Sequence, residues 1–218
     1  MNRVDAFWKP KGCTSYDVIR KLKTYLGKTK IGHAGTLDPI AEGILIILFG
    51  KSTKKQAIMM DLEKEYIATI QLGKTTTTLD PEGEYTAESP IGDLDENKIN
   101  AVLKKFIGEI SQVPPIYSAL KRNGKPLYKF ARQGKDVKIE PRKINVFGIQ
   151  LLSFTKDTIK IQVQCGKGTY IRSLARDIAL ELGTVGFLTS LTRTRIGKFE
   201  KDSAVTIERI PNWLSTMV

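Results

Sequence analysis

The 218-residue sequence is poor in metal-binding side chains, with one histidine and two cysteines. Cys13 and Cys165 lie far apart and form no C-x-x-C pair, so we expect reduced thiols and neither a disulfide nor a zinc site. The N-terminus lacks the apolar segment of a signal peptide, and the apolar run 44–49 is too short to cross a bilayer. These absences predict a cytoplasmic protein that binds neither metal nor membrane.

Acidic residues are also outnumbered, because 35 Lys and Arg face 23 Asp and Glu and give a net charge of +12. Such an excess favours a polyanionic partner, since each neutralised phosphate releases condensed counterions. A basic protein without such a partner is the alternative that charge alone leaves open. Apolar residues make up 41% of the chain, so we expect it to fold as a single domain, 1–218.

Hydrophobic periodicity predicts an α+β fold with a mixed sheet, because strands and helices follow one another without βαβ regularity. The expected strands are 4–8, 44–49, 64–72, 187–194 and a hairpin of 143–154 with 158–165. The expected helices are 53–62, 95–107, 169–182 and one capped by Thr14 or Ser15 and ended by Gly27. Ile107 is expected to face inward, 73–89 to form a polar loop, and 204–213 to form a short closing element.

Two segments carry basic side chains in patterns that suit RNA. The polar face of the helix before Gly27 bears Arg20, Lys21 and Lys23, although a charged face is often only solvated. The segment 111–135 mixes prolines and aromatic residues with six Lys or Arg. Basic side chains among aromatic ones suit a surface that grips a backbone and stacks bases. A packed surface loop explains the composition of 111–135 equally well.

The segment 32–45, Gly-His-Ala-Gly-Thr-Leu-Asp-Pro-Ile-Ala-Glu-Gly-Ile-Leu, holds the single histidine and an aspartate on a backbone punctuated by glycine and proline. An Asp-Pro pair is ordinarily a turn, so spacing alone makes Asp38 a turn or capping residue. The segment resembles the catalytic motif of the TruB family of tRNA pseudouridine synthases, G-H-x-G-T-L-D-P-x-A-x-G-x-L. Every fixed position of that motif is present.

The resemblance implies a pseudouridine synthase fold, with a central, mostly antiparallel mixed sheet flanked by helices and loops. It also implies that Asp38 is the nucleophile that attacks a flipped uridine. Arg172, in the second motif at 166–172, would lie beside Asp38 and favour its ionised form. Tyr66 would stack on the target base and take part in proton transfer. Tyr170 would line the pocket, and Leu191 would form its apolar wall.

The resemblance further implies which residues bind the substrate. His33 would enter the RNA loop and hold the everted nucleotide, with Gly35 and Thr36 of the same motif beside it. Lys9 belongs to an N-terminal motif that supports the catalytic loop, and Asp80 to a D-x-x-G turn. The segment 111–135 resembles the insertion that clamps the T stem-loop. The family's C-terminal PUA domain has no counterpart here, which predicts a short form.

The implied function is conversion of uridine 55 in the tRNA T loop to pseudouridine. This isomerisation oxidises nothing and imports no group, so we expect neither cofactor nor metal. The chain would act as a monomer. The alternatives are a pseudouridine synthase for another RNA, including a guided catalytic subunit, and a non-catalytic tRNA chaperone or RNA-binding module. The presence of Asp38, Tyr66 and Arg172 together favours catalysis, because a pure binder needs no such trio.

Overall fold

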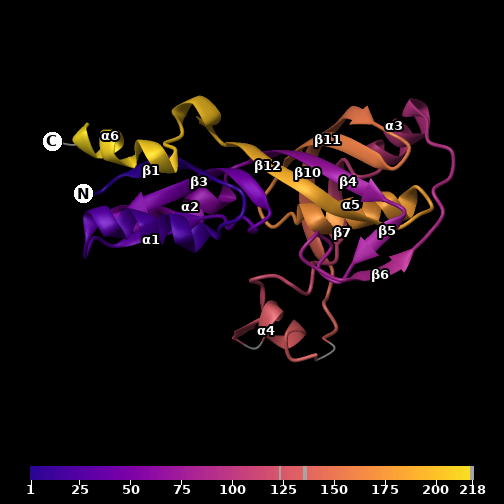
Figure 1. The fold of residues 1–218 in the computed structure, drawn as a ribbon, viewed down its shortest axis with the longest axis horizontal. Helices are drawn as coiled ribbons and strands as arrows, with labels where there is room; N and C mark the ends of the chain where they lie inside the picture. The colour runs from indigo at the N-terminus through magenta and orange to yellow at the C-terminus, as the bar shows by residue number, and fades with distance from the viewer. Residues whose placement is uncertain (123, 135–136, 217–218) are drawn as a thin grey trace. The chain divides into compact units, whose positions relative to one another are not determined.

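A computed structural model of the protein describes residues 1–122, 124–134 and 137–216. The chain forms two compact units, which we call unit 1 (Met1–Ile67 with Ser190–Val218) and unit 2 (Ala68–Thr189) (Figure 1). The boundary falls within two strands, β4 (Lys64–Leu72) and β12 (Gly186–Ile196). The expectation of a single catalytic domain stays a prediction.

Unit 1 is built around β3 (Ala41–Phe49), a nine-residue strand of which all but one residue are buried. On β3, β1 (Val4–Lys9) and β2 (Ile31–Ala34) pair in antiparallel fashion, whereas β12 pairs in parallel. The short β13 (Phe199–Glu200) pairs antiparallel with β12. The predicted strands at 4–8 and 44–49 are therefore confirmed, and the sheet is mixed.

The helices of unit 1 cover the apolar residues of these strands. The first helix, α1 (Ser15–Leu26), is capped by Thr14 and ends at Gly27, as predicted. Its buried side chains pack with Phe7 and Phe49, and Trp213 of α6 (Ile210–Ser215) meets Phe7 edge-on at a centroid distance of 5.0 Å. The helix predicted at 53–62 is a 3₁₀ helix, Gly50–Lys55, followed by α2 (Gln56–Asp61).

Unit 2 contains the predicted hairpin of β10 (Arg142–Phe154) with β11 (Thr158–Cys165). On the other side of β10 lies β7 (Gly108–Gln112), also antiparallel. Helices α3 (Glu96–Lys104) and α5 (Ile171–Glu181) confirm the helices predicted at 95–107 and 169–182, each with shorter bounds. The arrangement of both units agrees with the predicted α+β class.

Two details of unit 2 differ from the sequence prediction. The supposed loop 73–89 contains a short hairpin of β5 (Lys74–Thr76) with β6 (Tyr85–Glu88). All of β6 is exposed, so the alternation that reveals a half-buried strand is missing. Ile107 is 44% exposed, because α3 ends at Lys104 and the chain then turns toward β7. The prediction that Ile107 faces inward was wrong.

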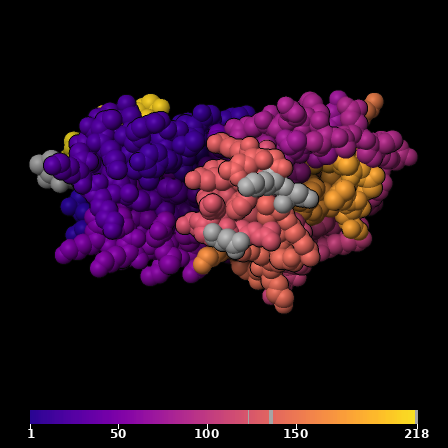
Figure 2. Space-filling view, turned by 90° about the horizontal axis from the view of Figure 1, so that it is seen from below, coloured from indigo at the N-terminus to yellow at the C-terminus, as the bar shows by residue number. Residues whose placement is uncertain are grey.

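The insertion segment, 111–135, leaves unit 2 after β7, to which its first two residues belong. It holds a two-residue hairpin, β8 (Lys121–Arg122) with β9 (Lys125–Pro126), and the helix α4 (Leu127–Ala131). Figure 1 shows α4 standing away from β7 and β10, and Figure 2 shows the same segment at the surface. Its positions 123 and 135 lie outside the described residues.

None of the helices within the described ranges has the length and apolar character needed to cross a membrane.

Candidate active site

The Asp38 loop, residues 35–40, joins β2 to β3 in unit 1. Ser15, the first residue of α1, holds this loop through its hydroxyl, which accepts from Leu37 N (2.9 Å) and donates to Leu37 O (3.1 Å). Gly12 N donates to Pro39 O at 2.8 Å on the other side of the aspartate. Asp38 itself is only partly buried. The loop therefore holds a partly buried aspartate on a backbone fixed on both sides.

Lys9 lies at the end of β1 and is completely buried. Its ammonium group donates to the carbonyls of Pro10 (2.9 Å) and Cys13 (2.6 Å), which shapes the segment leading to α1. Burial lowers the pKa of Lys9, while the negative charge of Asp38 acts against that shift. Lys9 thus fixes the backbone between β1 and α1, and its predicted support of the Asp38 loop stays a prediction.

Gly43 explains why the motif needs a glycine after the aspartate. It pairs with Lys9 of β1 on one side and with Arg193 of β12 on the other. Its φ is +118°, and a Cβ there would overlap the backbone of Arg193. Only glycine adopts this conformation without strain and lets β12 approach so closely. The parallel pairing also places Leu191 opposite Ala41, the first residue after the Asp38 loop. Leu191, predicted to form the apolar wall of the pocket, is buried there.

Arg193 is the residue of unit 1 that the sequence analysis missed. Its side chain is 1% exposed, yet its guanidinium donates to Ile44 O (2.7 Å), to Gly35 O (2.8 Å) and to the Tyr66 hydroxyl (3.5 Å). It also lies 5.9 Å from the centroid of the Tyr66 ring, within range of a cation–π contact. Arg193 thus connects the start of the Asp38 loop with the predicted base-stacking tyrosine.

A signal for Arg193 was present in the sequence. In a strand, residues two positions apart face the same side, so Arg193 shares the inward face of β12 with Leu191. A charged residue at an inward strand position is costly to bury unless its donors are satisfied. That cost could have marked Arg193 as a residue with a specific task.

His33 lies on β2, where it is half buried. Burial lowers the pKa of its imidazole, and the positive charge of Arg193 lowers it further. Gln56 Nε2 donates to His33 O at 2.8 Å and fixes the backbone, whereas within the described ranges the buried Nδ1 has no hydrogen-bond partner. A neutral imidazole of this kind suits contact with a nucleobase better than it suits proton transfer. Thr36, near the start of the Asp38 loop, is exposed.

The lowered pKa of His33 predicts a pH effect on stability. Below its ordinary pKa of 6.5 the unfolded chain binds a proton more readily than the folded one, so folding weakens as pH falls toward the folded-state pKa. Above 6.5 this effect is absent. We expect urea unfolding at pH 7.5 and pH 5.5 to show a smaller loss of stability in His33→Gln than in the parent protein. Equal losses of stability in the variant and the parent protein would contradict a lowered pKa of His33 in the folded state.

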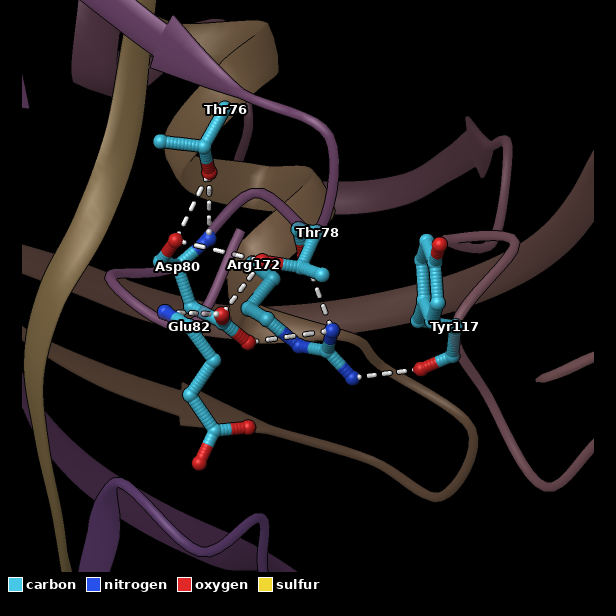
Figure 3. Close-up of polar contacts among 6 residues, drawn as sticks. All are labelled: Thr76, Thr78, Asp80, Glu82, Tyr117 and Arg172. Atoms are coloured by element: carbon cyan, nitrogen blue, oxygen red, sulfur yellow. Dashed lines mark hydrogen bonds and ion pairs between the residues drawn. The ribbon is translucent and has the colours of Figure 1, made fainter. Parts of the chain in front are cut away.

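Unit 2 contains a buried cation of its own, Arg172 on α5, which is 5% exposed (Figure 3). Its guanidinium forms an ion pair with Asp80 at 3.2 Å and donates to the carbonyls of Thr78 (2.9 Å) and Tyr117 (2.8 Å). The Asp80 carboxylate also accepts from the Thr78 hydroxyl (2.5 Å) and from Glu82 N (3.1 Å). Asp80 therefore fixes Arg172 and the turn that follows β5.

Tyr170 precedes α5 and is half buried. The Gln112 side chain bonds to both the N–H and the carbonyl of the Tyr170 backbone. It accepts from Tyr170 N (2.9 Å) and donates to Tyr170 O (3.2 Å). Gln112 is the last residue of β7 and is 1% exposed. The same side chain thus ties the start of the insertion segment to the start of α5. The sequence analysis did not identify this role.

The structure groups the predicted site residues into two sets. Unit 1 holds the nucleophile candidate with its neighbours, namely Lys9, His33, Gly35, Thr36, Asp38, Tyr66 and Leu191. Unit 2 holds Asp80, Tyr170 and Arg172. Asp38 and Arg172 belong to different units, so the expected contact between them stays a prediction.

Comparison with known proteins gives a consistent match. Residues 23–171 match the profile of the TruB family pseudouridylate synthase N-terminal domain. A tRNA pseudouridine synthase B from Francisella philomiragia is 47% identical over 211 residues, which cover 96% of this chain and 70% of the relative. A protein of the same name from Francisella tularensis matches with the same identity and coverage.

Solved structures are similar over almost the whole chain. One chain of a Cbf5-Nop10-Gar1 complex superposes with a TM-score of 0.74 at 31% identity. A chain of an H/ACA RNP bound to a substrate RNA containing 2'-deoxyuridine superposes with a TM-score of 0.71 at 28% identity. Each comparison covers 99% of this chain but only 56% and 55% of the solved chains, so this chain spans little more than half their length.

Proposed function

Because the chain belongs to the TruB family of pseudouridylate synthases, we propose that it converts uridine 55 in the T loop of tRNA to pseudouridine, with Asp38 as the nucleophile. Family membership and the structural similarity confirm the predicted pseudouridine synthase fold. The 47% identity to proteins named tRNA pseudouridine synthase B supports tRNA as the substrate. The observation that carries the proposal is a partly exposed Asp38 on a loop whose backbone is bonded to Ser15 and Gly12 on its two sides.

The reaction breaks the N-glycosidic bond of uridine, turns the uracil and rejoins it to the sugar through carbon-5. The hydrogen displaced from carbon-5 leaves as a proton, and the ring nitrogen released from the sugar takes one up, so no oxidant or co-reactant is required. The Asp38 carboxylate supplies the nucleophile, whether it adds to the base or to the sugar carbon. In this proposal Tyr66 stacks on the base and takes part in the transfer of the carbon-5 proton.

The surroundings of Asp38 suit a fixed, ionised nucleophile. Arg193 holds Gly35 at the start of the loop and Tyr66 on β4, so both groups keep one geometry relative to each other. We assign Arg193 the role of a positioning residue, since its guanidinium acts through these two partners. Arg172, fixed by Asp80, would lie beside Asp38 and stabilise its charge in the substrate complex.

Binding requires the target nucleotide to leave its stack, which costs a few kcal/mol. His33, Gly35 and Thr36 would hold the everted nucleotide, while Leu191 and Tyr170 would enclose the uracil. Basic and aromatic residues of the insertion segment would grip the T stem-loop. In this proposal the chain acts as a monomer in the cytoplasm.

A second candidate function is pseudouridine formation in another RNA, directed by a guide. It is favoured by the similarity to a chain of an H/ACA RNP bound to a substrate RNA. That chain is 28% identical to this one, compared with 47% for the tRNA enzymes, so we rank the tRNA reaction first.

Incubation of the purified chain with an unmodified tRNA transcript, without any guide RNA, will test the proposal. We expect one pseudouridine, at position 55, when the product is mapped by mass spectrometry of nuclease fragments. A transcript with cytidine at position 55 is the matched control and should remain unmodified. Product only at another position, or only after a guide is added, would favour the second candidate. No product under any condition would overturn both.

A further inference from the structure

The helix α1 is a rigid platform in unit 1. Thr14 and Asp17 form a capping box at its N-terminus, and Gly27 ends it at the other side with a φ of +53°. Its inner face, Val18, Ile19 and Leu22, is buried in the cluster around Phe7 and Phe49. Because the inner face and both ends are fixed, the outer face presents its side chains in a set geometry.

This platform is attached directly to the Asp38 loop. Both hydrogen bonds between Ser15 and Leu37 join the first residue of α1 to the residue before the proposed nucleophile. The helix has 12 residues, so it extends for about 18 Å from that junction. In Figure 1, α1 runs along the outer side of the unit 1 strands, and in Figure 2 the indigo N-terminal segment lies at the surface.

The outer face of α1 combines cations with exposed aromatic rings. Tyr16, Arg20 and Lys23 form one row along the helix, because residues four and three positions apart lie on the same side. Lys21 and Tyr25 form a second row, with the Lys21 ammonium 5.8 Å from the centroid of the Tyr25 ring. Tyr16 and Tyr25 are 57% and 44% exposed, so both rings present apolar surface to solvent.

Little negative charge offsets these cations. Between Thr14 and Lys30 the sequence has one acidic residue, Asp17, and five basic ones. The Asp17 carboxylate accepts from the backbone (2.7 Å) and hydroxyl (2.8 Å) of Thr14, and these bonds lower its pKa. It also pairs with Arg20. The only acid is therefore used to cap the helix, while Lys21, Lys23, Lys28 and Lys30 stay exposed.

We infer that the α1 face, defined as Tyr16, Arg20, Lys21, Lys23 and Tyr25 of the helix together with Lys28 just beyond its end, binds the sugar-phosphate backbone of the substrate RNA outside the reacting nucleotide. Lysines and arginines attract phosphates, and exposed tyrosines offer stacking surfaces to unpaired bases. An RNA whose nucleotide reaches Asp38 comes close to the start of α1, because Ser15 ties the two together. The inference rests on the proposed function and extends its RNA contacts beyond the insertion segment.

The test uses an Asp38→Asn background, so that binding is measured without turnover. In this background we compare the full chain with the variant Lys21→Gln/Lys23→Gln/Lys28→Gln, in which glutamine keeps a similar helix propensity. Affinity for unmodified full-length tRNA is measured by filter binding at several salt concentrations. At about 0.1 M salt we expect binding about 10-fold weaker, and the slope of log affinity against log salt smaller by about 2.

A matched control removes three exposed lysines from unit 2, as Lys104→Gln/Lys156→Gln/Lys160→Gln. It lowers the net charge by the same amount, and we expect its affinity to stay within about 2-fold of the parent. If the α1 variant bound tRNA like this control, with an unchanged salt slope, the inference would be wrong. Equal losses of affinity in the two triple variants would also overturn it, because the effect would then be one of total charge.

This experiment separates the inference from the proposed function. The binding comparison needs no product, so a chain that forms no pseudouridine can still show a specific loss at the α1 face. Conversely, a chain that modifies position 55 but binds tRNA equally well without the three α1 lysines keeps the proposed function and loses the inference. Repeating the comparison with the isolated T stem-loop locates the contact, since an effect on full-length tRNA alone places it outside that hairpin.

Discussion

Asp38→Asn is expected to abolish pseudouridine formation, with a fall in rate of at least about 10⁴-fold, while tRNA affinity stays within about 2-fold. Asparagine has nearly the same shape as aspartate, so the Asp38 loop should keep its bonds to Ser15 and Gly12. The neutral amide lacks the anionic oxygen that the proposed attack requires. Single-turnover assays at saturating tRNA measure the rate, and filter binding measures the affinity.

Glu42→Gln is the matched control for this prediction. Glu42 is a half-buried carboxylate on β3, four residues after Asp38, and its side chain accepts from the Thr192 hydroxyl at 3.3 Å. Its neutralisation removes the same charge from the same unit without touching the nucleophile, so most of the rate should remain. Full activity in Asp38→Asn would end the assignment of the nucleophile. Equal loss in both variants would show that the effect follows the charge of unit 1 and is not specific to residue 38.

Asp80→Asn is expected to have the second largest effect, on both stability and turnover. It removes the negative charge from an ion pair in which Asp80 and Arg172 are 2% and 5% exposed. Loss of one partner of a buried pair is strongly destabilising, and we expect the free energy of unfolding in urea to fall by about 3 kcal/mol. Because Arg172 is proposed to stabilise the charge of Asp38, turnover at saturating tRNA should fall more than tRNA affinity does.

Glu181→Gln provides the comparison for Asp80→Asn within unit 2. Glu181 pairs with Lys105 at 2.5 Å, but the two side chains are 41% and 62% exposed, so solvent screens the pair. Its loss should cost less than about 1 kcal/mol and leave turnover unchanged. If Asp80→Asn retained the full rate at a temperature where it is folded, Asp80 would have only a structural role, and the proposed action of Arg172 on Asp38 would lose its support.

The elements that the sequence predicted well are those with local signals. The bounds of α1 follow from the Thr14 cap and Gly27, which act within a few residues. The burial pattern of β4 alternates at every residue, as its sequence predicts. The β5–β6 hairpin was missed because its strands are short and polar. One of its contacts, Thr75 Oγ1 to Gly186 O at 3.3 Å, spans 111 positions of the sequence.

The site residues stay a prediction from the sequence, and their surroundings came only from the structure. Lys9 and Asp80 were expected to bind substrate, and the structure shows both almost fully buried, each bonded to the chain around it. Arg193 and Gln112 were not expected at all. Each holds a predicted site residue, Tyr66 and Tyr170 respectively, across a long separation in sequence.

The sequence by itself determined the family, the motif around Asp38, the caps and periodicities of the main elements, and an excess of positive charge. These depend on residue identity and on neighbours a few positions away, which a linear pattern records. Only the tertiary structure decided that Arg193 is buried against Gly35, 158 positions earlier, and that Arg172 meets the carbonyl of Thr78, 94 positions earlier. Such contacts form only when strand pairing and helix packing bring distant segments together. The folded chain then supplies the acceptors that make burial of a charged side chain affordable in free energy, and a linear pattern does not record those acceptors.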